Sequence, residues 1–148
     1  MDVAATPKNT KCPKFYTKVV NGLIQIWFGN VWLNPPFSEI ELWAKKGWEY
    51  AQTGKGVVVA LLPIWPSAPW FQKYAVHGHI RLLTTRIRFE GTVTLAPFNL
   101  MVVVWTATSQ CKHGRLHVTM EEVSDPSKAA RQARVAAKAM VQRKVALP

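Results

Sequence analysis

The residue types with the clearest chemical potential stand together in the tetrapeptide Asn34-Pro35-Pro36-Phe37. Neither proline has an N–H, and each restricts the residue before it to extended conformations. The segment therefore offers only hydrogen-bond acceptors, namely the Asn34 side-chain oxygen and the neighbouring main-chain carbonyls, beside the flat ring of Phe37. Two acceptors can each take one hydrogen of an amino group on a stacked heterocycle, which directs the nitrogen lone pair at an electrophile. The alternative interpretation is a strand-ending turn, because Asn and Pro are ordinary turn residues.

The surrounding sequence predicts a βαβ unit over residues 31–62, with the tetrapeptide at its first strand-to-helix turn. The apolar run 31–33 precedes it, and Ser38 with Glu41 three residues later has the pattern of a capping box. Residues 38–53 then have helical periodicity, and Gly54 is a suitable stop. One helix face is predicted to be buried: Ile40, Trp43, Ala44, Gly47 and Ala51. The apolar run 57–62 is typical of a parallel strand buried on both faces. Ligands of open α/β sheets bind at the carboxyl ends of the strands, where the tetrapeptide would lie.

The remaining segments predict shorter elements. Residues 1–30 read as irregular, although 2–5 could end a strand. A short helical piece is expected over 70–76, strands over 79–83 and 100–105, a hairpin arm or surface loop over 86–91, and an edge strand within 115–123. Ser124-Asp125-Pro126 then begins an Ala-rich basic helix. We therefore expect a shortened α/β domain over residues 1–123 and a basic helical tail over 124–148.

The charge balance indicates a polyanionic partner. The 148-residue chain has 19 Lys and Arg against 8 Asp and Glu, a net charge of +11, and nucleic acid is the simplest partner of such a protein. In the tail, four basic residues share one helix face, which is either plain solvated surface or a phosphate contact: Lys128, Arg131, Arg134 and Lys138.

The sequence also excludes several classes of protein. No apolar run approaches the roughly 20 residues that span a bilayer, and the N-terminus lacks the pattern of a signal peptide. We therefore expect a soluble, cytoplasmic protein of a bacterial host or a phage. Cys111, His113 and His117 have no standard zinc spacing, so no metal is expected. No Gly-x-Ser-x-Gly or phosphate-loop pattern is present.

The tetrapeptide resembles the Asp/Asn-Pro-Pro-Tyr/Phe/Trp motif of amino-group methyltransferases. Flanking segments are similar, in the same order, to the phage-type Dam family of DNA N6-adenine methyltransferases over roughly residues 2–105. These segments are 2–5, 9–12, 15–16, 22–23 and Trp27 upstream, and 61–63, 70–71, 86–89 and 96–98 downstream. The tetrapeptide taken alone would also fit RNA and protein-glutamine methyltransferases.

The resemblance implies a Rossmann-like methyltransferase sheet, S-adenosylmethionine as methyl donor and adenine in double-stranded DNA as acceptor. Asn34, Pro35 and Pro36 would then hold the amino group, and Phe37 would stack on the flipped base. Asp2 and Ala4, together with Asn34, are the candidate donor-binding residues. The candidate DNA-binding residues are Arg86 and Arg88 and the four basic residues of the tail. No metal is implied.

Two departures from the family pattern affect the expected activity. The chain has no glycine-rich turn for the donor, and it begins at Asp2-Val3-Ala4-Ala5, where the family usually has preceding sequence. We therefore expect a truncated copy that binds S-adenosylmethionine weakly, because almost no strand precedes these residues to hold them. The function that the resemblance implies first is still an active DNA adenine methyltransferase, and the second function class is an inactive or truncated DNA-binding remnant of the family. A third alternative is an RNA or protein-glutamine methyltransferase.

Overall fold

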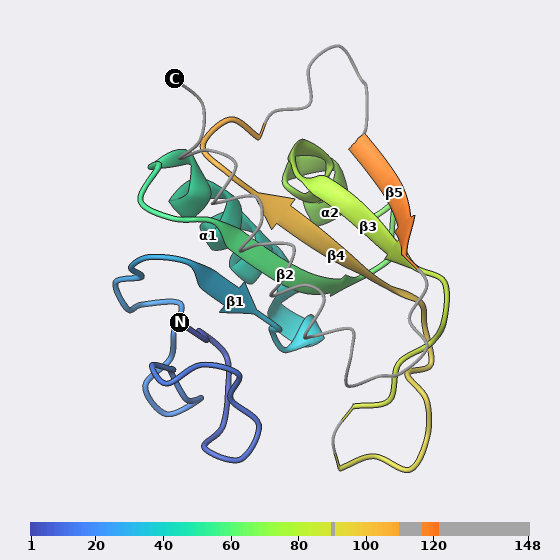
Figure 1. Ribbon diagram of the computed structural model, residues 1–148, viewed down its shortest axis with the longest axis horizontal. Helices are drawn as coiled ribbons and strands as arrows, with labels where there is room; N and C mark the ends of the chain where they lie inside the picture. Colours follow the sequence, from blue (N-terminus) through green and yellow to red (C-terminus); the bar gives the residue numbers. More distant parts are fainter. Residues whose placement is uncertain (90, 110–116, 122–148) are drawn as a thin grey trace.

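A computed structural model of the chain describes residues 1–89, 91–109 and 117–121. Within this part, five strands form one mixed sheet in the order β1-β2-β4-β3-β5 (Figure 1). β1 and β2 are parallel, β3 and β5 are parallel, and β4 runs antiparallel to both of its neighbours, β2 and β3. The protein is thus of mixed α/β class, and four strands have their carboxyl ends at the same edge of the sheet.

The predicted βαβ unit is confirmed. It consists of β1 (Val31–Leu33), the 3-10 turn η1 (Phe37–Glu39), α1 (Ile40–Gln52) and β2 (Val58–Pro63). The five buried residues of α1 are those that the periodicity predicted. Gly54 follows the helix with a φ of +73°, a left-handed conformation that glycine adopts without steric cost.

The predicted capping box is wrong. Neither η1 nor α1 has a side-chain hydrogen bond at its N-terminus, and the 3-10 turn makes Glu39, not Ser38, the residue that precedes α1. Pro36 already sets an extended backbone at this point, so the chain enters the helix through a tight turn. The Glu41 carboxylate instead accepts a hydrogen bond from the Lys73 ammonium of α2 at 3.3 Å.

The second half of the sheet matches the sequence prediction in position. The helical piece predicted over 70–76 is split into α2 (Pro69–Lys73) and η2 (Ala75–His77), since the backbone of Tyr74 leaves the helical region. β3 (His79–Leu83) and β4 (Leu100–Trp105) lie where strands were predicted, and β5 (His117–Glu121) is the predicted edge strand. Residues 86–89 and 91 belong to the loop between β3 and β4, as one of the two interpretations had it. The basic tail, including Lys128, Arg131, Arg134 and Lys138, lies outside the described residues.

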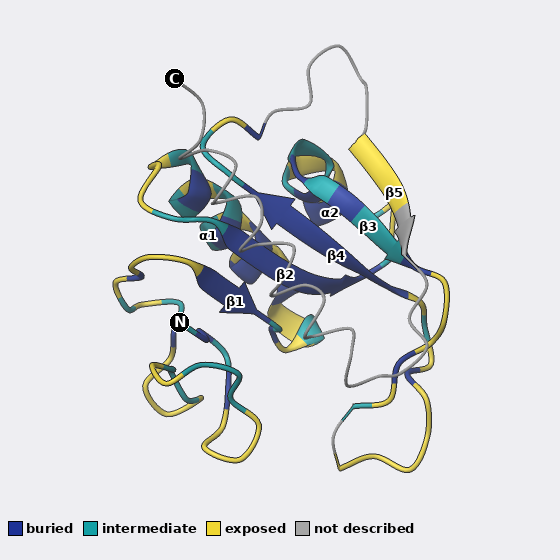
Figure 2. Ribbon diagram, in the orientation of Figure 1, coloured by how far each residue is buried: buried dark blue, intermediate teal, exposed yellow. Residues whose placement is uncertain are grey.

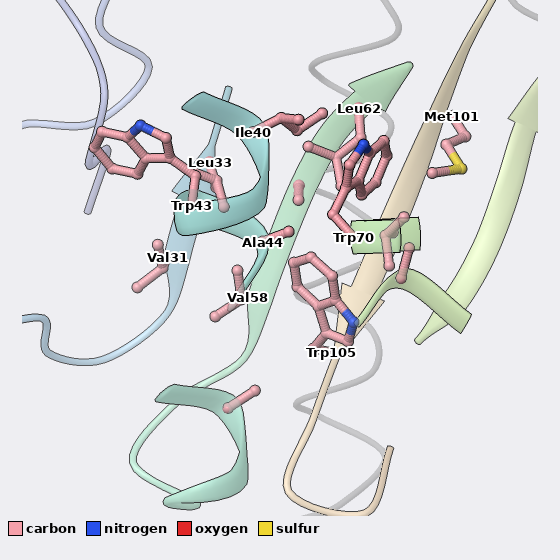
Figure 3. Packing of buried hydrophobic residues seen from close by; sticks show 14 of the residues in the cluster. Val31, Leu33, Ile40, Trp43, Ala44, Val58, Leu62, Trp70, Met101 and Trp105 are labelled. Atoms are coloured by element: carbon pink, nitrogen blue, oxygen red, sulfur yellow. The ribbon is translucent and has the colours of Figure 1, made fainter. Parts of the chain in front are cut away.

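The core lies between the sheet and the helices α1 and α2. Figure 3 shows Leu33, Val58 and Trp105 of the sheet facing the α1 residues Ile40 and Ala44. Helix and sheet approach closely at Gly47, where a Cβ would lie 3.1 Å from the Trp105 ring. A second buried cluster covers the opposite face of β2 and β4, and it explains why both strands are buried throughout (Figure 2).

The N-terminal segment is irregular, as expected, but it is tightly anchored. The Lys46 ammonium of α1 donates hydrogen bonds to the carbonyls of Gly22, Leu23 and Gln25, at 3.2, 2.6 and 2.6 Å. A Cβ at Gly22 would collide with the Val3 carbonyl oxygen, so this loop packs directly on the backbone of the first residues. In the described part of the chain, no helix is long and apolar enough to cross a membrane.

Candidate functional site

Asn34 is the first residue after β1, at the edge of the sheet where four strands end. β1 is fully buried, which fixes the position at which the chain leaves the sheet. Asn34 is half-buried, Pro35 is buried and Pro36 is exposed. No hydrogen bond joins the Asn34 amide to the described residues. With respect to the described residues, this half-buried amide is therefore left available to a ligand or to water.

The main-chain carbonyls of the tetrapeptide differ in their availability. The Pro36 carbonyl accepts the Glu39 N–H at 3.2 Å, which closes the 3-10 turn. Within the described residues, no backbone N–H bonds to the carbonyls of Asn34 and Pro35. Among the described residues, the Asn34 side-chain oxygen and the Pro35 carbonyl are therefore two acceptors on adjacent residues that no donor engages.

Phe37 lies in a cluster of aromatic rings at the same edge. Its centroid is 6.5 Å from that of Trp65, 6.4 Å from Phe89 and 5.4 Å from Phe98, with every pair close to edge-to-face. Trp65 follows β2, whereas Phe89 and Phe98 belong to the loop between β3 and β4. Because edge-to-face neighbours fix a ring without stacking on it, Phe37 has a set orientation beside the free acceptors.

The Asp2 segment lies against the outer side of β1. Asp2 forms parallel bridges with both Phe15 and Trp32. The Trp32 N–H donates to the Met1 carbonyl at 2.8 Å, and the Val3 N–H donates to the Trp32 carbonyl at 3.2 Å. The expectation that little structure holds these residues is therefore wrong, since hydrogen bonds fix them on two sides. The backbone of Ala4 is thereby placed near the end of β1, where Asn34 begins.

The Asp2 carboxylate itself is turned inward. The side chain is 2% exposed, and its oxygens accept the backbone N–H groups of Lys11 at 3.0 Å and Ala4 at 3.4 Å. Burial raises the pKa of this carboxyl, although the two amide hydrogen bonds act in the opposite direction. Asp2 therefore shapes the turn of residues 2–11, and its carboxylate oxygens are already in use.

Arg86 and Arg88 are both exposed on the loop between β3 and β4, on either side of buried Ile87. Arg88 precedes Phe89, which contacts the Phe37 ring. The two arginines thus lie on the segment that packs against the tetrapeptide.

Comparison with known proteins settles the family. A family model described as DNA N-6-adenine-methyltransferase (Dam) matches residues 1–145. The chain belongs to the Dam family. The resemblance inferred from the tetrapeptide and its flanking segments is thereby confirmed.

One Dam relative is the DNA N-6-adenine-methyltransferase of Escherichia phage T1. It is 38% identical to this chain over 73 residues, which make up 48% of this chain and 30% of the phage protein. The match thus spans less than a third of that protein. No solved structure matches this chain.

Dam methyltransferases generally use S-adenosylmethionine. The surroundings of each candidate donor-binding residue can therefore be compared with what binding of this donor requires. Ala4 is half-buried and Ala5 is buried, and the N–H of Ala5 already donates to the Tyr16 carbonyl at 3.0 Å. The unbonded amide of Asn34 fits a polar ligand. Asp2 fits a role in shaping the turn, because its carboxylate is buried and hydrogen-bonded to the backbone.

Two features of this Dam chain were not predicted from the sequence: the aromatic cluster around Phe37 and the Lys46 contacts. Trp65, Phe89 and Phe98 stand far apart in the sequence, and only the richness of this region in aromatic residues could have indicated a cluster. Among the described residues, no group of three His, Cys, Asp or Glu could hold a metal. Cys111 and His113 lie outside the described part, and His117 packs against His79 with the ring centroids 3.9 Å apart.

Proposed function

We propose that this chain methylates the N6 amino group of adenine in DNA. The observation that carries the proposal is the pair of free acceptors at the end of β1, the Asn34 side-chain oxygen and the Pro35 carbonyl. Each would take one hydrogen of the adenine amino group, which would direct the nitrogen lone pair away from the ring plane. Membership of the Dam family supports adenine in DNA as the acceptor.

Within this proposal, Phe37 stacks on the adenine ring and Pro35 and Pro36 keep the two acceptors rigid. A base paired inside a duplex cannot place its amino group between them, so the adenine must leave the stack. S-adenosylmethionine would supply the methyl group as an electrophile on its sulfonium sulfur, and the adenine amino nitrogen would release one proton when it gains the methyl group. The backbone of Ala4 and the amide of Asn34 would contact this donor, and Asp2 would hold the Ala4 turn in place.

We also propose that the sheet is a shortened Rossmann-like sheet. Parallel β1 and β2, joined by α1, with the ligand edge at their carboxyl ends, are features of doubly wound folds. The antiparallel β4 is compatible with this, because α/β sheets often include a strand of opposite direction. The domain would extend over residues 1–123. Residues 124–148 would add a basic tail whose Lys128, Arg131, Arg134 and Lys138 contact phosphates, together with Arg86 and Arg88.

A second candidate function is DNA binding without catalysis. It is favoured by the absence of a glycine-rich donor turn and by the engagement of both Asp2 oxygens with backbone amides. Calorimetric titration with S-adenosylmethionine addresses this alternative directly. We expect weak binding by this chain, whereas a remnant without a donor site would give no heat of binding at all.

Product analysis tests the proposed function. The purified protein is incubated with labelled S-adenosylmethionine and, in separate reactions, with unmethylated double-stranded DNA, RNA and a glutamine-containing peptide. We expect label in N6-methyladenine from DNA alone. Label in RNA or in the peptide would show that the proposed acceptor, adenine in DNA, is wrong. Binding of DNA without label in any product would favour the non-catalytic alternative.

A further inference from the structure

Trp65 differs from the other tryptophans of the chain in its exposure. All seven tryptophans lie among the described residues; Trp48 is half-buried and five are buried. Trp65 is exposed, with 37% of its surface open to solvent. Because tryptophan is enriched among the residues that dominate binding, an open indole beside the candidate site is a candidate contact for the ligand.

The backbone holds the indole at the edge of the sheet where the tetrapeptide lies. Trp65 stands two positions after Pro63, the last residue of β2, and β2 is the neighbour of β1. The Trp65 N–H donates to the Pro63 carbonyl at 3.2 Å, and the Trp65 carbonyl accepts the Ala68 N–H at 3.0 Å. The Ile64 N–H donates to the Asn99 carbonyl at 3.0 Å, which joins this turn to the segment that enters β4. The indole is therefore presented on a formed turn.

Aromatic contacts fix the orientation of the indole. Its centroid lies 6.5 Å from that of Phe37, 5.7 Å from that of Phe98 and 6.4 Å from that of Trp70. All three contacts are edge-to-face, and the plane of the indole meets that of Phe37 at 71°. Two rings at this angle form a corner, so one flat base cannot stack on both of them. A base that stacks on Phe37 therefore leaves the indole facing either the edge of that base or the sugar attached to it.

The direction in which the adenine extends from its acceptors decides between the base edge and the sugar. The amino group and the bond to the sugar lie at opposite ends of a purine. The candidate donor segment lies along the side of β1 away from β2, because Asp2 bridges to Trp32 of the edge strand β1. Since the methyl group would reach the nitrogen from that side, the purine extends from the acceptors toward the end of β2. Its sugar then lies beside Trp65.

We propose that the indole of Trp65 packs against the deoxyribose of the target nucleotide and selects DNA over RNA. The 2′-hydroxyl is the group by which a protein distinguishes the sugar of RNA from that of DNA. Against the apolar face of an indole, this hydroxyl loses its water without gaining a hydrogen-bond partner, which disfavours a ribonucleotide. This inference rests on the proposed function, because it takes the adenine to be held by Asn34 and Phe37.

The surroundings of the indole support a preference for deoxyribose. Phe37 and Phe98, which contact the indole, have no polar side-chain atoms. Pro66, which follows Trp65, has no N–H that could bond to a hydroxyl. The corner at Trp65 therefore offers apolar contact to a deoxyribose, and the rings that form it do not compensate a buried 2′-hydroxyl.

The test compares two duplexes that differ in one oxygen atom. The sequence that the parental protein methylates is first mapped, and its target is then made as deoxyadenosine in one duplex and as riboadenosine in the other. We expect the parental kcat/KM to be about 10- to 100-fold higher for deoxyadenosine, since apolar sites reject an added hydroxyl by up to about 100-fold. Trp65→Ala should remove most of this ratio, because water can then reach the hydroxyl. Trp65→Gln, which offers a hydrogen-bond partner, should do the same, whereas Trp65→Phe should retain most of the preference.

The matched control is Phe28→Ala, which should keep the parental ratio, since Phe28 is a 45% exposed aromatic residue of the N-terminal loop. Equal parental values for the two duplexes would overturn the inference and leave the proposed function intact. The same ratio in the parent, Trp65→Ala and Trp65→Gln would also overturn it. Because each ratio is measured with one protein, partial loss of folded protein in a variant does not change it. A parental protein that methylates no DNA would instead contradict the proposed function, and the inference with it.

Discussion

The rings of Phe37 and Phe98 meet at 64° with their centroids 5.4 Å apart. This contact joins the tetrapeptide after β1 to the loop that precedes β4, although 61 positions separate the two residues (98 minus 37). Phe37 therefore has two tasks in this account: it is the proposed stacking surface for adenine, and it anchors the loop.

Substitution of Phe37 should separate the two tasks. Phe37→Tyr keeps an aromatic face and should remain active, and Phe37→Trp should be tolerated as well. Phe37→Ala should lose the stacking energy of about 1–3 kcal/mol per base and also lower the melting temperature. Steady-state kinetics and thermal melting of the three variants provide the measurement. Equal activity of the Ala and Tyr variants would remove the stacking role.

The sequence allowed the βαβ unit to be predicted because its signals are local. The spacing of Ile40, Trp43, Ala44 and Ala51 defines one helix face, and Gly54 can end the helix without help from other elements. The direction of β4 could not be predicted in this way. An apolar run such as 100–105 reads the same in a parallel and an antiparallel sheet, and its direction depends on pairing with the distant β2.

The site was predicted only in part, for the same reason. Asn34 and Phe37 stand in a motif, so the sequence alone placed them at the end of a strand. The aromatic partners of Phe37 come from two other segments, and no periodicity connects them. The capping box failed because local pattern matching ignores the two prolines, which already direct the chain into a 3-10 turn.

Lys46 should stabilise the N-terminal loop, and through it the Asp2 segment. Lys46→Met keeps the aliphatic stem but removes the hydrogen bonds to the Gly22, Leu23 and Gln25 carbonyls, and we expect a loss of about 1–3 kcal/mol in the free energy of unfolding. The control is Lys45→Met. Lys45 lies 3.8 Å from the exposed Glu49 carboxylate, and such surface pairs contribute at most about 0.5 kcal/mol. Denaturant unfolding compares the two, and equal losses would contradict the role of Lys46.

Acidification should weaken the pairing of β3 with β5. Burial, and then the nearby positive charges of His117 and Arg81, lower the pKa of His79 below its usual 6.5. Because the unfolded chain then binds the proton more readily, this contribution to stability is present above pH 6.5 and is lost as the pH falls through the lowered pKa of His79. We expect the melting temperature to fall on acidification below pH 6.5.

The variant His79→Gln isolates this effect in melting curves between pH 7.5 and 5.5. Asp2 changes stability in the opposite direction, because burial raises its pKa and its contribution improves as the pH falls. The difference between parent and variant cancels the Asp2 contribution. Identical pH dependence in the two proteins would show that His79 does not control the stability of this strand pair.

Arg86 and Arg88 should contribute to DNA affinity through phosphates. Each lost phosphate contact should reduce the slope of log K against log salt concentration by about 0.9. For Arg86→Ala/Arg88→Ala we therefore expect a slope smaller by up to about 2, with no change in the methylated sequence. Deletion of residues 126–148 should flatten the salt dependence in the same way. Fluorescence anisotropy at several salt concentrations measures both, and unchanged slopes would assign these residues to solvated surface.

The central claim is that the free amide of Asn34 holds the reacting amino group. The most direct test is the single-turnover rate of methyl transfer to DNA by Asn34→Ala, compared with the parent and with Asn99→Ala, an exposed asparagine at the same edge of the sheet. We predict a rate about 100- to 1,000-fold lower for Asn34→Ala, as is typical for loss of one well-placed hydrogen-bonding group. Asn99→Ala should match the parent, and all three proteins should have the same melting temperature. A parental rate for Asn34→Ala would show that the tetrapeptide is only a turn and would contradict the account.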